Sequence, residues 1–280
     1  MGTEAMQQPG YALGHSEHEL ARLSRQGQIF LPFTRQFFEQ AGIGPGMHVL
    51  DVGSGAGDVS LLAAELVGPE GRVVGVDCAE AAVAWATARV RSQQIEHVDF
   101  LLGDPAKMEF CQRFDAIIGR FVLMYYPDPV AAIRSLTRHL RPNGLIVFQE
   151  WDMEYLGTHP AALTFERAAE WMRAAFRATG ARIRQGAELY PVFVSAGLPR
   201  PSLRMDILIG GGAEFQGYDL LAAVLESLFP VMEQLGIATA ADINFAKLAE
   251  RMRDEVVAAK GVALSPALIG AWCRKSDSSE

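Results

Sequence analysis

The sequence predicts an α/β fold in which a mostly parallel sheet lies between two layers of helices. Short apolar runs alternate with helical segments over about residues 44–150, and such alternation is typical of a parallel sheet covered on both faces. The first run ends in a cluster of glycines, as a buried strand does when it turns tightly into a helix. The 280 residues, of which 50% are hydrophobic, are enough to bury a sizeable core in one large domain.

Composition narrows the classes of partner. The 25 basic and 33 acidic residues give a net charge of −8, whereas a general binder of nucleic acids or anionic membranes usually carries the opposite sign. Three widely separated cysteines, Cys78, Cys111 and Cys273, exclude a disulfide scaffold and argue against a zinc ribbon. We find neither a secretory signal nor an apolar run of membrane-spanning length, so we expect a soluble cytoplasmic protein.

Two helices are expected before the first strand, and together they form an N-terminal cap over residues 1–43. Ser16 and Glu19 fit a capping box, in which the hydroxyl accepts from free N–H groups of the helix and the carboxylate reaches back. The first helix should therefore run over 16–26. The second should cover 30–40 and end at the glycines that follow.

The region 44–150 is predicted to be the core of the sheet. Five mostly apolar runs are its expected strands: 48–52, 72–77, 98–102, 115–118 and 145–149. Helices are expected over 59–67 and 80–92, where apolar residues recur at helical spacing. Asp128 and Pro129 predict the start of a third helix, with aspartate as N-cap and proline at the first helical position.

The region 151–280 should complete the sheet with late strands and add helices that shape a substrate pocket. The expected helices are 160–179, 187–196, 218–235 and 240–260, and the expected strands are 203–208 and 262–273. The helix around Leu220–Phe229 is unusually apolar, which suits a core helix, a dimer contact or a lid over an apolar substrate.

The strongest functional signal is the run from Val49 to Gly57, which reads VLDVGSGAG. Glycines after a strand let the backbone approach a ligand, and the free N–H groups of the turn point at the same place. Asp77 stands 20 residues beyond Gly57, at the end of the second strand, where a carboxylate can accept from both hydroxyls of an adenosine ribose. Asp104 ends the third strand and is placed to accept from an adenine amino group.

The spacing of the glycines separates two nucleotide cofactors. A dinucleotide site needs a third small residue where this chain has Asp58, whose charge at the helix start would repel a pyrophosphate. The acidic surroundings, including Asp51 before the turn, suit a cofactor with a sulfonium and an ammonium and no phosphate. S-adenosylmethionine fits that description and NAD does not.

Further motifs are similar to those of one family. Residues 114–129 read FDAIIGRFVLMYYPDP, residues 140–145 read LRPNGL and residues 11–16 read YALGHS. With the glycine turn, they resemble the class I S-adenosylmethionine-dependent methyltransferases, in particular the bacterial ubiquinone/menaquinone-type small-molecule branch. The resemblance covers less than half of the chain well. It implies a Rossmann-like three-layer sandwich with a mostly parallel seven-stranded sheet and helical cap additions.

The resemblance also implies roles for individual residues. Gly53, Ser54 and Gly55, with Asp51 beside them, would line the methionine part of the cofactor. Asp77 and Cys78 would contact the ribose, and Asp104 and Pro105 the adenine. Arg120 and Phe121 would border the sulfonium, and Tyr11 and Gln26 would help the N-terminal helices to close over the cofactor. No metal is expected, since two histidines near the N-terminus lack further ligands.

The predicted reaction is a displacement at the methyl carbon, in which the protein aligns the acceptor and excludes water. An oxygen or nitrogen acceptor would need a base, and the candidates are His15, Glu150 or a water held by Tyr125. Glu150 could equally bind substrate or only solvate the sheet edge. A small, partly apolar metabolite is the expected partner, and a homodimer stays open. The alternatives are an NAD-dependent oxidoreductase, a protein or RNA methyltransferase, and a cofactor-binding protein without transfer activity.

Overall fold

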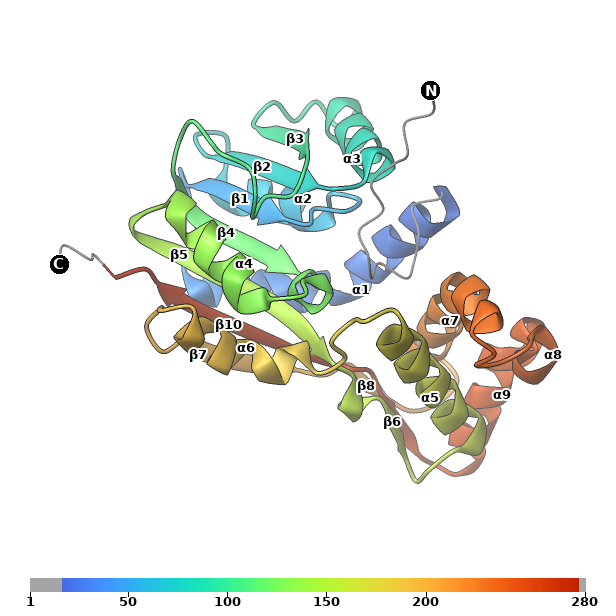
Figure 1. Cartoon of the computed structure of the whole chain (residues 1–280). Coiled ribbons are helices and arrows are strands. Elements are labelled where there is room, and N and C mark those ends of the chain that lie inside the picture. The colour runs from blue at the N-terminus through green and yellow to red at the C-terminus, as the bar shows by residue number, and fades with distance from the viewer. Residues whose placement is uncertain (1–16, 277–280) are drawn as a thin grey trace.

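The computed structural model describes the backbone of residues 17–276 and the side chains of residues 27–276. Its centre is a seven-stranded sheet in the order β3-β2-β1-β4-β5-β10-β7 (Figure 1). The strands are β1 His48–Val52, β2 Arg72–Asp77, β3 Val98–Leu102, β4 Phe114–Arg120, β5 Leu140–Asp152, β7 Ser202–Asp206 and β10 Ala267–Arg274. The predicted α/β fold with a seven-stranded sheet is confirmed.

The five strands of the predicted core run parallel, and β10 runs antiparallel to both of its neighbours, β5 and β7. β5 begins earlier than the sequence predicts. Leu140 pairs with Phe114 of β4 before the register shifts, and the regular pairing resumes at Leu145. The exposed residues 141–143 lie between these points, so the apolar pattern hides the start of the strand.

Helices cover both faces of the sheet, as predicted. One layer consists of α1 Glu17–Ala41, α2 Asp58–Val67 and α3 Glu80–Ser92, and the other of α4 Pro129–Leu136 and α6 Gln185–Ser195 (Figure 1). Successive strand residues face opposite layers: Val49 packs in the first and Leu50 in the second. Asp128 caps α4 by accepting from the N–H of Ala131, as its position before Pro129 predicts.

The N-terminal cap is one helix rather than two. α1 continues through the predicted break between residues 26 and 30 and through Pro32. Gly27 is buried in the crossing with α2, where a Cβ would lie 2.8 Å from the carboxylate of Asp58, so the glycine serves close packing and does not end the helix. The second half is anchored by Phe37 and Phe38, both fully buried, at about 1.5–3 kcal/mol each.

The added helices form a lobe beyond the carboxyl ends of β4 and β5 (Figure 1). The lobe comprises α5 Leu163–Ala178, α7 Gly217–Gln234, α8 Ala240–Ile243, α9 Phe245–Ala258 and a small sheet of β6 Gly157–His159, β9 Val262–Leu264 and β8 Ile209–Gly210. The apolar helix singled out in the sequence is α7. Its apolar face, including Leu221, Leu225 and Leu228, is buried against α5 and α9 and forms the core of the lobe.

Three boundaries in this half differ from the prediction. The helix predicted over 160–179 begins at Leu163. The helix predicted over 240–260 is broken at Asn244, whose φ is 52°, a conformation that asparagine tolerates better than most residues. The strand predicted over 262–273 is broken before Ala267, because Pro266 has no N–H for a ladder, and its first part joins the small sheet instead.

Candidate active site

The turn after β1 has three glycines in the left-handed region, with φ of 68° at Gly53, 51° at Gly55 and 86° at Gly57. At Gly53 a Cβ would lie 2.5 Å from Cγ2 of Val122, so packing inside the protein requires the glycine. At Gly55 a Cβ would meet no atom of the described residues within 4 Å. The turn therefore presents bare main chain to open space, which is the arrangement expected where a ligand approaches the backbone.

Asp77, at the end of β2, is tied to this turn. One carboxylate oxygen, Oδ2, accepts from the N–H of Gly55 at 2.8 Å, and Oδ1 accepts from the N–H of Ala79 at 2.9 Å. A carboxylate offers about four acceptor sites, so capacity remains for further donors. The carboxylate is thus fixed by two backbone groups beside the glycine turn.

Asp51, at the end of β1, is buried beneath the turn. Its Oδ2 accepts from the hydroxyl of Ser60 at 2.5 Å, while Oδ1 and the hydroxyl of the buried Ser54 have no hydrogen-bond partner among the described residues. Burial raises the pKa of Asp51 to about 7, although the Ser60 hydrogen bond and the charge of Arg120 lower it. The site therefore holds polar atoms whose desolvation is only partly compensated.

Asp58, at the start of α2, has its charge balanced in part. Arg89 donates to its Oδ1 at 2.9 Å and also to the carbonyl oxygen of Ala56. The repulsion of a pyrophosphate, which the sequence suggests, is therefore weaker than an unpaired carboxylate would give. The Asp58 side chain still occupies the position where a dinucleotide site needs a small residue, so the steric argument against a dinucleotide is unchanged.

Asp104, after β3, is already engaged by the protein. Its Oδ1 accepts from the hydroxyl of Tyr126 at 3.1 Å and from a nearby backbone N–H, and its Oδ2 pairs with the ammonium of Lys107 at 2.9 Å. Burial and the Asp104 charge raise the pKa of Tyr126, so the phenol stays protonated and donates. An adenine amino group would compete with these donors, or take one of the remaining acceptor positions.

Cys78 and Pro105 lie next to these two acids. The Cys78 thiol donates to the carbonyl oxygen of Gly103 at 3.2 Å, which links the ends of β2 and β3. Pro105 is buried directly after Asp104. The predicted ribose and adenine residues therefore share one edge of the sheet.

The turn after β4 contains the two residues expected around a sulfonium. Arg120 donates to Oγ1 of Thr34 at 2.9 Å, and Thr34 donates to Oε1 of Gln149 at 2.8 Å, so a polar chain joins α1 to the ends of β4 and β5. Burial lowers the pKa of Arg120, and the charges of Asp58 and Asp51 oppose that shift.

Phe121 has a φ of 58°, which is unusual for an aromatic residue. Its N–H donates to the carbonyl oxygen of Gln149 at 2.9 Å. Its ring lies 4.4 Å from the ring of Trp151 and 6.2 Å from that of Phe30, measured between centroids. An aromatic cluster therefore borders this turn.

The three candidate bases, Glu150, Tyr125 and His15, differ in their burial and in whether the structure describes them. Glu150 is fully buried, and its Oε1 accepts from the N–H groups of Val122 and Leu123. Tyr125 is half-buried after the same turn. His15 and Tyr11 lie outside the described residues, and Gln26 lies in α1 with its side chain likewise outside the description.

The sequence alone predicts no site role for Thr34, Val122, Gln149 or Trp151. Each contacts a predicted site residue in the fold. Gln149 and Trp151 flank Glu150 near the carboxyl end of a strand, and this position is the signal that could have predicted them as site residues. Nothing in the local sequence points to Thr34, because the two side chains that it bonds, Arg120 and Gln149, are more than 80 residues away.

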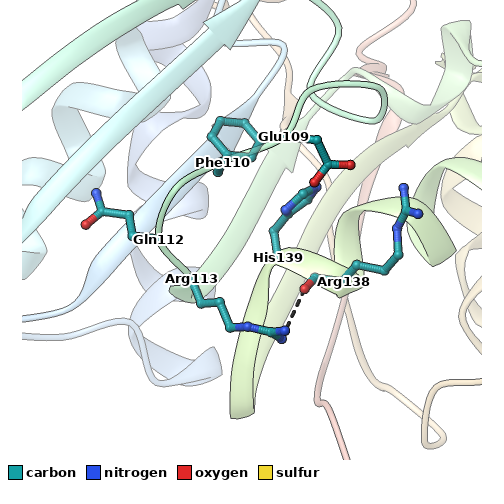
Figure 2. Close-up of a pocket in the computed structure, with 6 residues that line it drawn as sticks. All are labelled: Glu109, Phe110, Gln112, Arg113, Arg138 and His139. Atoms are coloured by element: carbon teal, nitrogen blue, oxygen red, sulfur yellow. Dashed lines mark hydrogen bonds between the residues drawn. The ribbon is translucent and has the colours of Figure 1, made fainter.

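A cavity of about 230 Å³ lies elsewhere, between the loop before β4 and the start of β5. Figure 2 shows its lining side chains, among them Phe110, Arg113 and His139. Phe110 stacks edge-on against His139, and Arg113 donates to the carbonyl oxygen of Arg138. These residues lie at the amino ends of β4 and β5, so the cavity is at the opposite edge of the sheet from the glycine turn.

No helix within residues 17–276 is both long and apolar enough to cross a membrane. In the same part of the chain, no group of three or more His, Cys, Asp or Glu side chains is arranged to hold a metal ion.

A family model described as "Methyltransferase domain" matches residues 43–197. Among curated proteins, nocamycin O-methyltransferase of Saccharothrix syringae is 37% identical over 120 residues, which cover 42% of this chain and 43% of that protein. A demethylmenaquinone methyltransferase of Lactococcus lactis is 29% identical over 126 residues, covering 45% of this chain and 48% of that protein. The chain thus spans less than half the length of these curated relatives.

Solved structures share the fold at low identity. The YcgJ protein of Bacillus subtilis has a TM-score of 0.56 and 17% identity, covering 86% of this chain and 96% of that one. Geranyl diphosphate C-methyltransferase of Streptomyces coelicolor has a TM-score of 0.50 and 18% identity, covering 93% of this chain and 86% of that one. The similarity extends beyond the core into the added lobe.

Proposed function

The chain belongs to the methyltransferase domain family, and from this premise we propose that it transfers a methyl group from S-adenosyl-L-methionine to an oxygen, nitrogen or carbon atom of a small, partly apolar molecule. S-adenosyl-L-methionine is the cofactor of this class I fold. The observation that carries the proposal is the 2.8 Å hydrogen bond from the Gly55 N–H to Asp77, which holds a carboxylate beside bare main chain.

The residues at this edge fit such a cofactor. Gly55 borders open space, and Asp77 keeps acceptor capacity for ribose hydroxyls after its two backbone hydrogen bonds. The unpartnered Oδ1 of Asp51 and hydroxyl of Ser54 would gain partners from the polar methionine end. The Asp77 carboxylate gives the negative surroundings that suit a cation, and a cation bound here would favour the ionised form of Asp51.

At such a site the positive charge of Arg120 would repel a sulfonium, so nearby negative charges must compensate it. Asp51 and Asp58 both interact with it electrostatically, and Thr34 accepts one of its hydrogen bonds. We infer that these contacts hold the guanidinium against α1, and that Arg120 orders the wall of the site and does not bind the methyl donor directly.

When bound, the cofactor supplies a methyl group on an activated leaving group. The work left to the chain is to align the acceptor and to exclude water. Phe30, Phe121 and Trp151 form an aromatic wall between the turn after β4 and α1. Phe30 and Trp151 are buried and support the half-buried ring of Phe121, which is the part of this wall that can meet an apolar acceptor. The two curated relatives are named as methyltransferases of nocamycin and of demethylmenaquinone, and both names support a small-molecule acceptor.

For an oxygen or nitrogen acceptor, a group at the site must take a proton. Tyr125 is the described candidate that remains half-exposed at the turn after β4. We propose that it holds a water or the acceptor at this point. His15 stays a candidate of the N-terminal segment.

Isothermal calorimetry with S-adenosylhomocysteine tests the cofactor assignment, with NAD as the matched control ligand. We expect binding of S-adenosylhomocysteine and none of NAD. A mass-spectrometric screen of candidate metabolites for gain of one CH₂ group would then identify the acceptor. Binding of NAD alone would support the oxidoreductase alternative, and cofactor binding without product across the screen would support a protein without transfer activity.

A further inference from the structure

Glu150 stands at the carboxyl end of β5, and its side chain reaches the turn that follows the neighbouring strand β4. Its Oε1 accepts from the N–H of Val122 at 2.9 Å and from the N–H of Leu123 at 2.7 Å. Glu150 is 0% exposed, so a substrate in the cleft would have no access to this carboxyl group. We propose that Glu150 is a positioning residue that clamps the Arg120–Phe121 turn, and that it is not the catalytic base.

The turn needs a clamp because its backbone is strained. Phe121 adopts a φ of 58°, and a bulky residue in this region costs about 1–3 kcal/mol. Directly after Phe121, two consecutive N–H groups turn away from β4 and would be left without partners in a buried setting. The carboxyl oxygen of Glu150 satisfies both of them, which fixes the direction of the chain after the strained residue.

The clamp acts on the cofactor site through Val122. A Cβ on Gly53 would lie 2.5 Å from Cγ2 of Val122, so Val122 fills the space that the missing side chain leaves. A shift of Val122 would therefore displace or loosen the glycine turn that presents bare main chain to the cofactor. The contacts thus run from Glu150 through Val122 to Gly53. Their expected effect on cofactor binding rests on the proposed function.

The protonation of Glu150 agrees with a holding role. Burial raises its pKa to about 8, against the lowering effect of the hydrogen bonds from the backbone N–H groups of Leu123 and Val122. Its second oxygen, Oε2, is buried without a hydrogen-bond partner among the described residues. At neutral pH the group is mostly a neutral acid whose Oε1 still accepts, so a glutamine of the same length should replace it.

Three substitutions distinguish a positioning role of Glu150 from a role as catalytic base, with S-adenosylhomocysteine affinity as the readout. Glu150→Gln keeps the acceptor at the same reach and should leave the affinity within about threefold of wild type. Glu150→Ala leaves two N–H groups unpaired and should weaken binding about tenfold or more. Glu150→Asp keeps the acid but shortens its reach, so its affinity should fall below that of Glu150→Gln.

Asp152→Ala is the matched control. Asp152 is on the same strand, equally buried, and also accepts from a backbone N–H, that of Glu154 at 3.0 Å, but it does not contact the turn after β4. Its loss should lower stability and leave the affinity unchanged. If Glu150→Ala fails to fold, the comparison of the other two variants gives the same test: the affinity of Glu150→Gln should exceed that of Glu150→Asp.

Hydrogen exchange in the ligand-free protein supplies a readout that is independent of the proposed function. The amides of Val122 and Leu123 should exchange at least about tenfold faster in Glu150→Ala, or in Glu150→Asp if the alanine variant does not fold, with no change in Asp152→Ala. Unchanged exchange and unchanged affinity in Glu150→Ala and Glu150→Asp would overturn the clamp. Failure of the wild-type chain to bind S-adenosylhomocysteine would overturn the proposed function, while faster exchange at these two amides would still support the clamp.

Discussion

The turns after β1 and after β4 lie at the same edge of the sheet and touch each other, yet they reach their shapes in different ways. The turn after β1 uses glycine at each left-handed position, including Gly53 and Gly55. The turn after β4 places Phe121 in that region and is held by Glu150 from the neighbouring strand. The first turn is permitted by missing side chains, and the second is stabilised by a tertiary contact.

The difference shows what each turn is built to present. Glycines leave the backbone uncovered, which suits close approach of a ligand. The clamped turn keeps its side chains and turns them inward: Phe121 joins the aromatic wall and Val122 packs onto Gly53. We infer that the first turn binds the cofactor and the second shapes the space around it.

The largest effect should come from Gly53→Ala. The new Cβ would lie 2.5 Å from Val122, and φ is 68°, so we expect a loss of about 2–4 kcal/mol in unfolding free energy and no measurable cofactor binding. Urea denaturation and calorimetry measure the two quantities. Wild-type stability in this variant would show that the two turns are not in contact.

Gly55→Ala sharpens the contrast within the first turn. Within the part of the chain that the structure describes, its Cβ would meet no atom within 4 Å, so only the φ of 51° is strained and the stability should fall by about 1–2 kcal/mol. The affinity for S-adenosylhomocysteine should nevertheless drop about tenfold or more, because the methyl group enters the space assigned to the ligand. Retained affinity would mean that the ligand does not approach this backbone.

Asp77→Ala should weaken S-adenosylhomocysteine binding by about 1–3 kcal/mol, since charge-assisted hydrogen bonds to the ribose would be lost together with the tie to Gly55. Asp99→Ala is a suitable control, because Asp99 is a half-exposed acid on β3 that pairs with Arg72. Equal affinities in the two variants would reduce Asp77 to a backbone cap.

The second turn predicts a pH effect on stability. Burial raises the pKa of Glu150 from 4.5 to about 8 and that of Asp51 from 3.8 to about 7. Between these values the unfolded chain ionises while the folded chain keeps the protons, so stability should fall as the pH rises from about 4 to 8. Below about pH 3 both groups are protonated in the folded and the unfolded chain, and the cost is absent.

The variant Glu150→Gln isolates one of the two groups. Measured by denaturation across this range, its stability relative to wild type should rise by roughly 4 kcal/mol from pH 4.5 to 8. Asp51 still titrates in both proteins and cancels in the difference. Parallel curves would show that Glu150 ionises as freely in the folded chain as in the unfolded one.

A smaller effect is expected from Thr34→Val, which keeps the shape and removes the hydroxyl between Arg120 and Gln149. We expect a loss of about 1–2 kcal/mol in unfolding free energy. Thr137→Val, which removes a hydroxyl bonded within its own helical turn, should cost less. If the two substitutions cost the same, the polar chain from α1 to β4 and β5 adds nothing to stability.

The first turn and its acid could be predicted from the sequence because their signals are local. Glycine spacing marks the turn, and Asp77 follows a recognisable strand. The clamp could not be predicted, because Phe121 looks like any apolar residue and Glu150 acquires its role only when β4 and β5 pair in register. The breaks at Asn244 and Pro266 carried local signals that the helical and apolar patterns outweighed.

The most direct test is a crystal structure of the chain with S-adenosylhomocysteine. The account predicts the ligand against the main chain of Gly53–Gly55, with its ribose within hydrogen-bond distance of Asp77. A ligand seated in the cavity beside Phe110 and His139, or a glycine turn filled by protein side chains, would contradict it.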